Sequence, residues 1–361
     1  MRWRGSMRFA IAALLVLHGL IHLIGLRLSG TRVVAALWLV TALLLVGAAA
    51  LRLFEKESWW IPAALGITLS QILIVRQWSD AKAGTVANVL LLLPVVVGFA
   101  TMRFHRANEE TARALLARAP TAAPANLSES DIASLPSPVK RWLEGSGAIG
   151  KPRARTVRLL QRGEMRTSPT GPFMHAEAKQ YFTVDEPGFV WTVDVTMFGV
   201  VPVVGRDTCI DGRTRMFIQA GGLVTVADGT GEKFDQGGLL RYLGEIIWFP
   251  SAALAPSITW EPIDDAKAKA TISHRGTTAS AVFEFDDRGR LTTMSAKRYF
   301  NGETLEDWSI PITEWKSLRG ISMPTRGSAV WKLSPEKGGD FEYYRWEILD
   351  VETNSRELWG D

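Results

Sequence analysis

Four apolar runs fill the first hundred residues of the chain. They cover residues 9–26, 33–53, 59–75 and 84–101. Each run is about long enough to cross the hydrocarbon core of a bilayer as a helix. A cleavable signal peptide would explain only the first run. Trp59, Trp60 and Trp78 lie at the ends of the third run, where indole rings favour the headgroup layer. The pattern predicts a four-span transmembrane domain over residues 1–104.

Residues 105–150 are polar and broken by prolines, which indicates a linker. The segment RFHRANEETARALLAR (103–118) has mixed charge and predicts a short exposed helix that continues the fourth span. Ser128 and Asp131 have the spacing of a helix cap. A second short helix is expected over VKRWLE, ending at Gly145. We interpret residues 105–150 as a helical linker.

Within residues 151–361 the period of apolar positions changes to two. About eleven segments alternate or are rich in β-branched and aromatic residues, among them HAEAKQYFTV, GFVWTVDVTM and TASAVFEFD. Short turns such as Asp228-Gly229 join them, which favours antiparallel pairing. One helical segment, Gln236–Leu254, interrupts the strands and is expected to pack its Leu240, Leu243, Ile247 and Trp248 side into the sheet. The fold class is therefore α+β, a four-helix transmembrane domain followed by a large curled antiparallel β-sheet with one packed helix.

Composition and charge exclude several classes of protein. The chain has 361 residues, 47% of them hydrophobic, and a single cysteine, Cys209, so it is neither disordered nor a disulfide scaffold. Residues 1–104 carry 10 basic and 3 acidic side chains, whereas the remainder is slightly acidic. The basic excess flanks apolar runs, so it does not indicate nucleic-acid binding.

The basic residues near the ends of the spans predict the orientation of the chain. With the N-terminus inside, nine Lys and Arg lie on the inner side and four on the outer side. The inner set is Arg2, Arg4, Arg8, Arg52, Lys56, Arg103, Arg106, Arg113 and Arg118, and the outer set is Arg27, Arg32, Arg76 and Lys82. The excess favours a multi-pass inner-membrane protein with a cytoplasmic C-terminal domain.

Three strings of residues carry a resemblance to a known family. They are LLRYLGEIIWFPSAAL, ITWEPIDDAKAKATI and FEFDDRGRLTTMSAKRYF. Together with LPSPVKRWLEGSG upstream, they resemble a family of uncharacterised bacterial membrane-anchored proteins defined as a domain of unknown function. The resemblance covers roughly Leu135–Glu352 and implies no activity.

The order of strands also resembles, at the level of fold, the half-barrel of periplasmic lipoprotein-carrier proteins, which hold acyl chains. That resemblance implies a lipid-like ligand. Because those carriers work outside the cytoplasmic membrane, it conflicts with the orientation that the charges predict.

His18 and His22 lie four residues apart on one face of the first span. Ionisable residues within a membrane are functional candidates, and such a pair can bind a metal or a haem. The spans contain no other His, Cys, Asp or Glu, so the favoured interpretation is hydrogen-bonded packing between helices. No metal or other cofactor is expected.

Arg241, Glu245 and Trp248 recur at spacings of four and three and share one face of the predicted helix. They could present an ion pair and an indole to a ligand in a cavity of the sheet. The alternative is an ion pair with a core tryptophan.

Glu261, Asp264 and Asp265 form a second candidate cluster in WEPIDD. Carboxylates can perform acid–base work or bind a cation, but aspartates in a turn more often bond the backbone. The sequence contains no G-x-S-x-G, H-E-x-x-H or Walker motif.

The sequence thus favours an integral membrane protein whose β-rich domain binds a hydrophobic or amphipathic ligand, or a partner protein, at the membrane surface. The alternatives are an enzyme acting on a lipid-derived substrate and a structural module of a membrane complex. Carboxylates and a histidine around one cleft would favour the enzyme.

Overall fold

The computed structural model describes the backbone of residues 2–360 and the side chains of residues 7–27 and 29–360. Asp361 and the side chains of Arg2 and Arg4, which entered the predicted domain boundary and charge count, lie outside the described residues. Contacts divide the chain into two compact units. One unit holds the N-terminal helices up to Arg106 together with residues 196–203 and 220–224, and the other holds the described residues of 107–195, 204–219 and 225–361.

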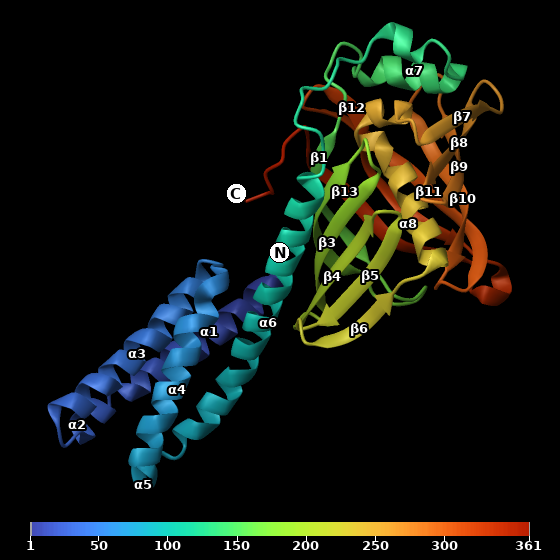
Figure 1. The fold of residues 1–361 in the computed structure, drawn as a ribbon. Helices are drawn as coiled ribbons and strands as arrows, with labels where there is room; N and C mark the ends of the chain where they lie inside the picture. Colours follow the sequence, from blue (N-terminus) through green and yellow to red (C-terminus); the bar gives the residue numbers. More distant parts are fainter. Residues whose placement is uncertain (1, 361) are drawn as a thin grey trace. The chain divides into compact units, whose positions relative to one another are not determined.

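The N-terminal part is helical (Figure 1). Its helices are α1 (Arg2–His22), α2 (Gly25–Leu28), α3 (Arg32–Leu53), η1 (Glu57–Trp59), α4 (Trp60–Arg76), α5 (Trp78–Ala81) and α6 (Gly84–Leu116). Four candidate spans, Met7–Arg27, Arg32–Leu53, Glu57–Arg76 and Gly84–Leu116, are long and apolar enough to cross a membrane, as predicted. Helix α6 runs on past the apolar run, so the charged segment continues the fourth span.

The helices pack through small and aliphatic residues. Leu15, Leu45, Ala63 and Leu91 form a buried cluster between them, and Gly66 lets α4 approach α3, because a Cβ at this position would meet Leu45 at 2.9 Å. Many outward side chains are apolar and exposed, Leu93 to 68%. A soluble protein rarely exposes so much apolar surface, whereas a bilayer would cover it.

Two short helices follow, η2 (Glu129–Ile132) and α7 (Ser137–Ser146). The predicted cap is present, since the backbone N–H of Ser128 donates to Asp131 at 2.8 Å. Helix α7 ends at Ser146, slightly later than predicted, because the left-handed residue that stops it is Gly147, with φ of 73°, and not Gly145.

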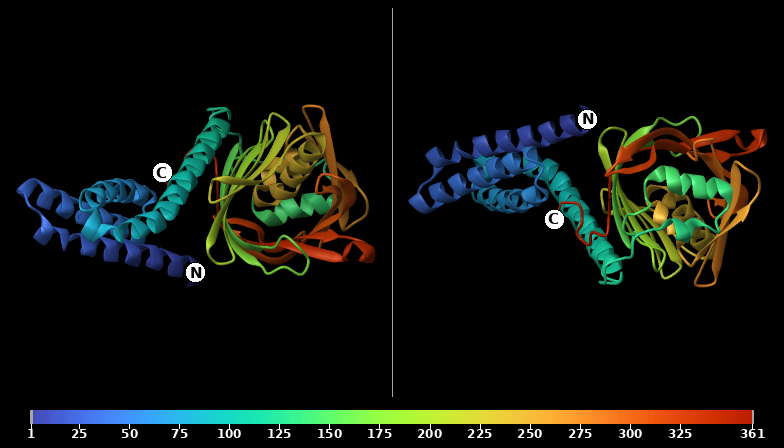
Figure 2. Two further views of the ribbon diagram at one scale, coloured as in Figure 1. Left: turned by 90° about the horizontal axis from the view of Figure 1, so that it is seen from below. Right: turned by 90° about the horizontal axis from the view of Figure 1, so that it is seen from above.

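Within residues 2–360, thirteen strands form one antiparallel sheet in the order β6-β5-β4-β3-β2-β1-β13-β12-β11-β10-β9-β8-β7. The strands are β1 (Thr156–Met165), β2 (Met174–Thr183), β3 (Gly188–Met197), β4 (Val201–Ile210), β5 (Arg213–Ala220), β6 (Val224–Gly229), β7 (Ile258–Pro262), β8 (Lys267–His274), β9 (Thr277–Phe285), β10 (Leu291–Phe300), β11 (Thr304–Leu318), β12 (Ile321–Lys332) and β13 (Asp340–Thr353). The first strand pairs with the last, and β6 and β7 remain as the two edges. The sheet curls as the sequence predicts, without closing between these edges (Figure 2).

Two of these strands, β4 and β7, are absent from the predicted set. Strand β4 begins with Val201-Pro202 and contains Gly205, residues that usually mark turns. Strand β7 has five residues and ends at Pro262, which an edge strand tolerates because one side of its backbone needs no partner.

The predicted helix is present as α8 (Glu232–Glu245), followed by η3 (Ile246–Trp248) and η4 (Pro250–Leu254). It starts four residues earlier than predicted, at acidic residues that favour a helix N-terminus. The α-helical part stops at Glu245, and Phe249 leaves the helical region, with φ of −141° and ψ of 72°, because a following proline disfavours the helical conformation.

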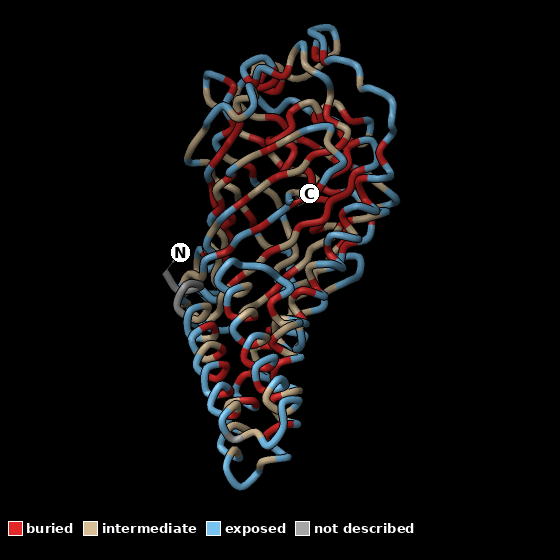
Figure 3. Tube along the Cα trace, turned by 90° about the vertical axis from the view of Figure 1, so that its left-hand side faces the viewer, coloured by how far each residue is buried: buried red, intermediate tan, exposed pale blue. Residues whose placement is uncertain are grey.

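Helix α8 packs on the inner side of the curled sheet against β8, β9 and β10. Its Leu240 and Leu243 are buried, as are Ile247 and Trp248 after it, as predicted. Buried stretches recur along the strands as well (Figure 3). The sheet and this helix therefore share one core, and the polar groups inside it form the candidate site.

Candidate functional site

The inner side of the sheet contains a charge network centred on Arg241 of α8, in which Arg241 and Asp207 are half-buried and Glu245 is buried. Its Nη1 donates to Asp207 Oδ2 on β4 and its Nε to Glu245 Oε1, both at 2.8 Å. Gln180 Nε2 on β2 donates to the other oxygen of Glu245 at 2.7 Å. The guanidinium also lies over the Trp191 ring, 4.6 Å from its centroid. The predicted pair Arg241 and Glu245 is thus joined by two partners from distant strands.

Burial dominates the electrostatics of this network. It raises the pKa of both Asp207 and Glu245, against the opposing effect of the Arg241 guanidinium. Burial acts to lower the pKa of Arg241, but the Glu245 and Asp207 carboxylates outweigh it, and the pKa of Arg241 is raised. Arg241 therefore stays charged, and its two carboxylates neutralise it, which leaves little attraction for an anion.

A second inward-facing arginine, Arg298 of β10, has different surroundings. Its Nη1 donates to the Tyr343 hydroxyl at 3.2 Å, and its guanidinium lies over the rings of Trp308 at 4.8 Å and Trp331 at 5.8 Å. It is half-buried. In the part of the chain that the structure describes, it forms no ion pair within 4.0 Å, and Asp207 feels its charge only at longer range.

Aromatic side chains surround Arg298 because of strand register. Trp308, Trp331 and Phe341 lie opposite one another on β11, β12 and β13 and so share a face of the sheet. Phe300 and Tyr343 contact Trp331 with ring centroids 5.1 and 6.0 Å apart. We call these five residues the aromatic wall.

A β-bulge brings Tyr343 into the aromatic wall. The β12–β13 register shifts between Ala329 and Val330, so that Tyr343 has no direct partner. At such a bulge two consecutive side chains can face the same side. Tyr343 accordingly reaches Arg298, while Tyr344 donates to Gln161 at 3.3 Å.

The other sequence candidates have partners of their own. Trp248 is buried against Trp346, with ring centroids 5.4 Å apart, and its indole N–H has no hydrogen-bond partner. Glu261 is exposed on the edge strand and pairs with Lys269 at 3.6 Å. Asp264 is exposed in a turn and accepts the Ala266 N–H at 2.8 Å. Only Arg241 and Glu245 of the predicted set lie together in the network.

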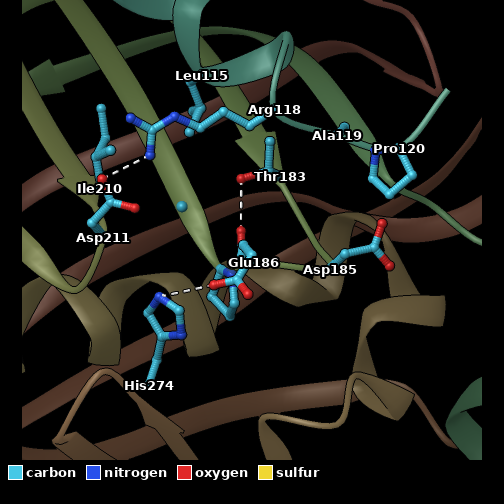
Figure 4. A pocket seen from close by; sticks show the side chains of 12 residues that line it. Leu115, Arg118, Ala119, Pro120, Thr183, Asp185, Glu186, Ile210, Asp211 and His274 are labelled. Atoms are coloured by element: carbon cyan, nitrogen blue, oxygen red, sulfur yellow. Dashed lines mark hydrogen bonds and ion pairs between the residues drawn. The ribbon is translucent and has the colours of Figure 1, made fainter.

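A separate small cavity of about 120 Å³ lies where α6 ends and the β2–β3, β4–β5 and β8–β9 turns meet (Figure 4). Asp185, Glu186, Asp211 and His274 line it. We call it the rim pocket. Its groups match the composition that the sequence analysis associated with an enzyme, since burial lowers the pKa of His274 and keeps the imidazole available as a base.

Each carboxylate of the rim pocket is nevertheless engaged by an arginine. Asp211 pairs with Arg118 at 2.8 Å, Glu186 with Arg275 at 3.4 Å and Asp185 with Arg155 at 3.7 Å. The distance from His274 Nε2 to Glu186 is 3.7 Å, longer than a hydrogen bond.

His18 and His22 belong to a chain of hydrogen bonds inside the helical part. His18 Nε2 lies 2.8 Å from Asn88 Oδ1 of α6, and His22 Nε2 lies 2.8 Å from the Ser70 hydroxyl of α4. Nδ1 of His22 donates to the His18 carbonyl at 2.7 Å. Among the residues the structure describes, no three His, Cys, Asp or Glu side chains converge on a metal position.

The sequence analysis did not single out Arg298. The available signal was the alternation of RLTTMSAKRYF, which puts Met294, Arg298 and Phe300 on one face of a strand. The alternation within this strand does not predict which other strands contribute side chains to the same face, because strand pairing is not a local property.

The chain is similar to two solved structures and matches one family model. It is similar to an outer membrane lipoprotein-sorting protein domain from Vibrio parahaemolyticus, at 8% identity and a TM-score of 0.35, over 57% of this chain and 88% of that one. A DUF1329 family protein from Desulfovibrio piger gives 9% identity and a TM-score of 0.34, over 61% and 94%. A search of curated proteins finds no match. The model of a family of unknown function, DUF6544, matches residues 125–346, more than half of the chain. The chain therefore belongs to this family, which confirms the resemblance seen in its sequence.

Proposed function

We propose that the β-rich domain binds an amphipathic molecule with an anionic head group on the inner side of its curled sheet. The head group would bind Arg298, and the apolar part would lie on the aromatic wall. The observation that carries this proposal is a half-buried arginine that has aromatic neighbours and no ion pair within the described residues.

The contrast between the two inward-facing arginines supports this choice. Arg241 is paired with Asp207 and Glu245, so its charge is already compensated. The Arg298 guanidinium has one donor engaged by a neutral hydroxyl and its face on rings. A partly desolvated guanidinium favours a carboxylate or phosphate, which it can bind with paired charge-assisted hydrogen bonds.

The four candidate spans suggest where such a ligand comes from. A protein held in a bilayer is close to fatty acids and phospholipids, whose chains are apolar and whose head groups are anionic. We therefore propose a lipid-derived ligand and a multi-pass membrane location.

The proposal is tested with the full chain in detergent, using a fluorescent long-chain fatty acid and the uncharged alcohol of the same chain. We expect the acid to bind more tightly than the alcohol. Arg298→Gln should weaken binding of the acid by roughly tenfold or more, since a hydrogen bond to a charged group contributes about 1.5–3 kcal/mol. Binding of the alcohol should be unchanged.

Arg288→Gln is the matched control, because Arg288 is exposed on the turn that precedes β10. It should leave both affinities as they are. Equal affinities for acid and alcohol, or an Arg298→Gln variant that still prefers the acid, would contradict the proposal.

A second candidate function, acid–base catalysis in the rim pocket, is favoured by His274 beside three carboxylates. It ranks below ligand binding because arginines engage all three carboxylates. Turnover of a long-chain nitrophenyl ester that is lost in His274→Gln and kept in Arg298→Gln would reverse this order.

A further inference from the structure

Two neighbouring turns of the sheet expose apolar side chains. The β3–β4 turn carries Phe198, exposed to 80%, and the β5–β6 turn leads into Val224, exposed to 65%. Val200, Leu223 and Val226 are also exposed. We call residues 198–201 and 223–224 the apolar tips, and neither segment contains a charged residue.

The two apolar tips form one patch. Strands β4 and β5 are adjacent in the sheet (Figure 1), and the Gly221 N–H donates to the Pro202 carbonyl at 2.7 Å. An exposed apolar edge of this kind promotes association of soluble proteins and is usually protected by charges. An apolar environment that covers these exposed side chains would explain why this patch carries no protecting charges.

The structure places these turns with the membrane helices. Residues 196–203 and 220–224 belong to the same compact unit as the helices up to Arg106. Within that unit Gly221 lies at ordinary contact distance from Val97, since a Cβ there would be 3.4 Å from it, and Gly222 lies closer to α6, because a Cβ there would meet the Ala100 carbonyl carbon at 2.7 Å. Only a glycine allows this approach.

This contact fixes a depth along the fourth span. Val97 and Ala100 are among the last residues of the apolar run 84–101, and Arg103 and Arg106 follow at once. Arginines just beyond an apolar run mark the headgroup layer. The tips thus lie where the hydrocarbon core meets the headgroups.

We propose that the apolar tips insert into the lipid bilayer beside the fourth span. The occupant is lipid and not a partner protein, because the tips lie at the level of a helix whose outward side chains need lipid as well. Aromatic and aliphatic side chains such as Phe198 and Val224 favour this interfacial depth. The proposal rests on α6 crossing a bilayer and is independent of the ligand at Arg298.

The test uses the full chain in vesicles of phosphatidylcholine and phosphatidylglycerol. Phe198→Cys or Val224→Cys is labelled with an environment-sensitive fluorophore and exposed to brominated lipids or to aqueous iodide. The native Cys209 is buried and does not compete for the label. We expect a blue-shifted emission, quenching by brominated lipid and protection from iodide at both positions.

Two control positions make the outcomes separable. Leu349→Cys labels a residue exposed on β13 to 45% and should be quenched by iodide alone. Leu93→Cys labels α6 and should be quenched by brominated lipid, which shows that the helix is in the bilayer. Lipid quenching at Leu93 with iodide quenching at both tips would overturn the proposal. Protection of the tips from both quenchers would also overturn it, since protein would then cover them.

Discussion

At the scale of single residues, the surroundings of a side chain decide its role more than its type. Arg241 and Arg298 both face the inside of the sheet, yet one is held by two carboxylates and the other by aromatic rings. The first stabilises the attachment of α8 to β4. The second keeps its charge available, which is why the proposed ligand is anionic.

Trp248 tests whether η3 is part of the core. It is buried against Trp346, so Trp248→Ala should lower the free energy of unfolding by about 3–5 kcal/mol. Leu349→Ala, at an exposed position, should change it by less than about 0.5 kcal/mol. Denaturant unfolding of both variants provides the comparison. An unchanged stability in Trp248→Ala would show that this tryptophan contacts solvent or ligand and not core.

Glu347 gives a pH dependence with a definite sign. Hydrogen bonds from Arg162 at 2.6 Å and Arg326 at 2.9 Å lower the pKa of this carboxyl from 4.5 to about 2. Because the unfolded chain then binds more protons, stability rises with pH across this window. The contribution is complete above about pH 4.5 and is lost as the pH falls towards 2.

The melting temperature of Glu347→Gln should therefore depend less on pH within this window than that of the native protein. Glu261→Gln is a suitable control, because Glu261 is exposed and forms only a long ion pair. Parallel pH profiles for the native chain and Glu347→Gln would mean that the two arginines do not hold this carboxylate in solution.

At the scale of elements, the attachment of α8 depends on close approach to the sheet. A Cβ at Gly238 would overlap the Thr214 side chain of β5, whose own Cβ is 3.0 Å away. Rotating Thr214 gives no relief, because its methyl group lies within 2.8 Å as well. The adjacent Gly237 has room, since its nearest neighbour is Arg298 Nε at 3.5 Å.

Two substitutions one residue apart should therefore have opposite effects. Gly237→Ala should stabilise the protein by about 0.5–1 kcal/mol, because alanine favours the helix. Gly238→Ala should destabilise it by about 1–3 kcal/mol, the usual effect of overpacking. Thermal or denaturant unfolding measures both. Equal shifts in the same direction would show that helix propensity outweighs the contact with β5.

At the scale of the whole molecule, the side of the membrane that holds the β-rich domain follows from the number of spans and their flanking charges. Four spans and nine inner against four outer basic residues predict a cytoplasmic C-terminus. A reporter enzyme that is active only after export should be silent when fused after Asp361. The same reporter fused after Gly30, in the first outer loop, should be active.

The reverse result at both fusion points would invert the topology. The β-rich domain would then face the periplasm. Activity at both points would mean that one of the four helices does not span.

The sequence by itself determined the four apolar helices, the period-two strands, the inner helix and the family. These are local properties, because the length of an apolar run and the alternation of side chains are visible within a few residues. Strands β4 and β7 were not predicted, and the reason is also local. They contain Pro202 and Pro262, and a proline usually indicates the end of a strand.

Only the tertiary structure decided the candidate site. Arg241 meets Asp207 across 34 residues, and Arg298 meets Tyr343 across 45. Whether an arginine on a strand faces a carboxylate or an indole depends on which strands become neighbours and on their register. A single bulge at Tyr343 changes which side chains face inward. The pairing of strands so far apart in the sequence depends on the energy of the whole sheet. It therefore cannot be predicted from any short segment of the chain.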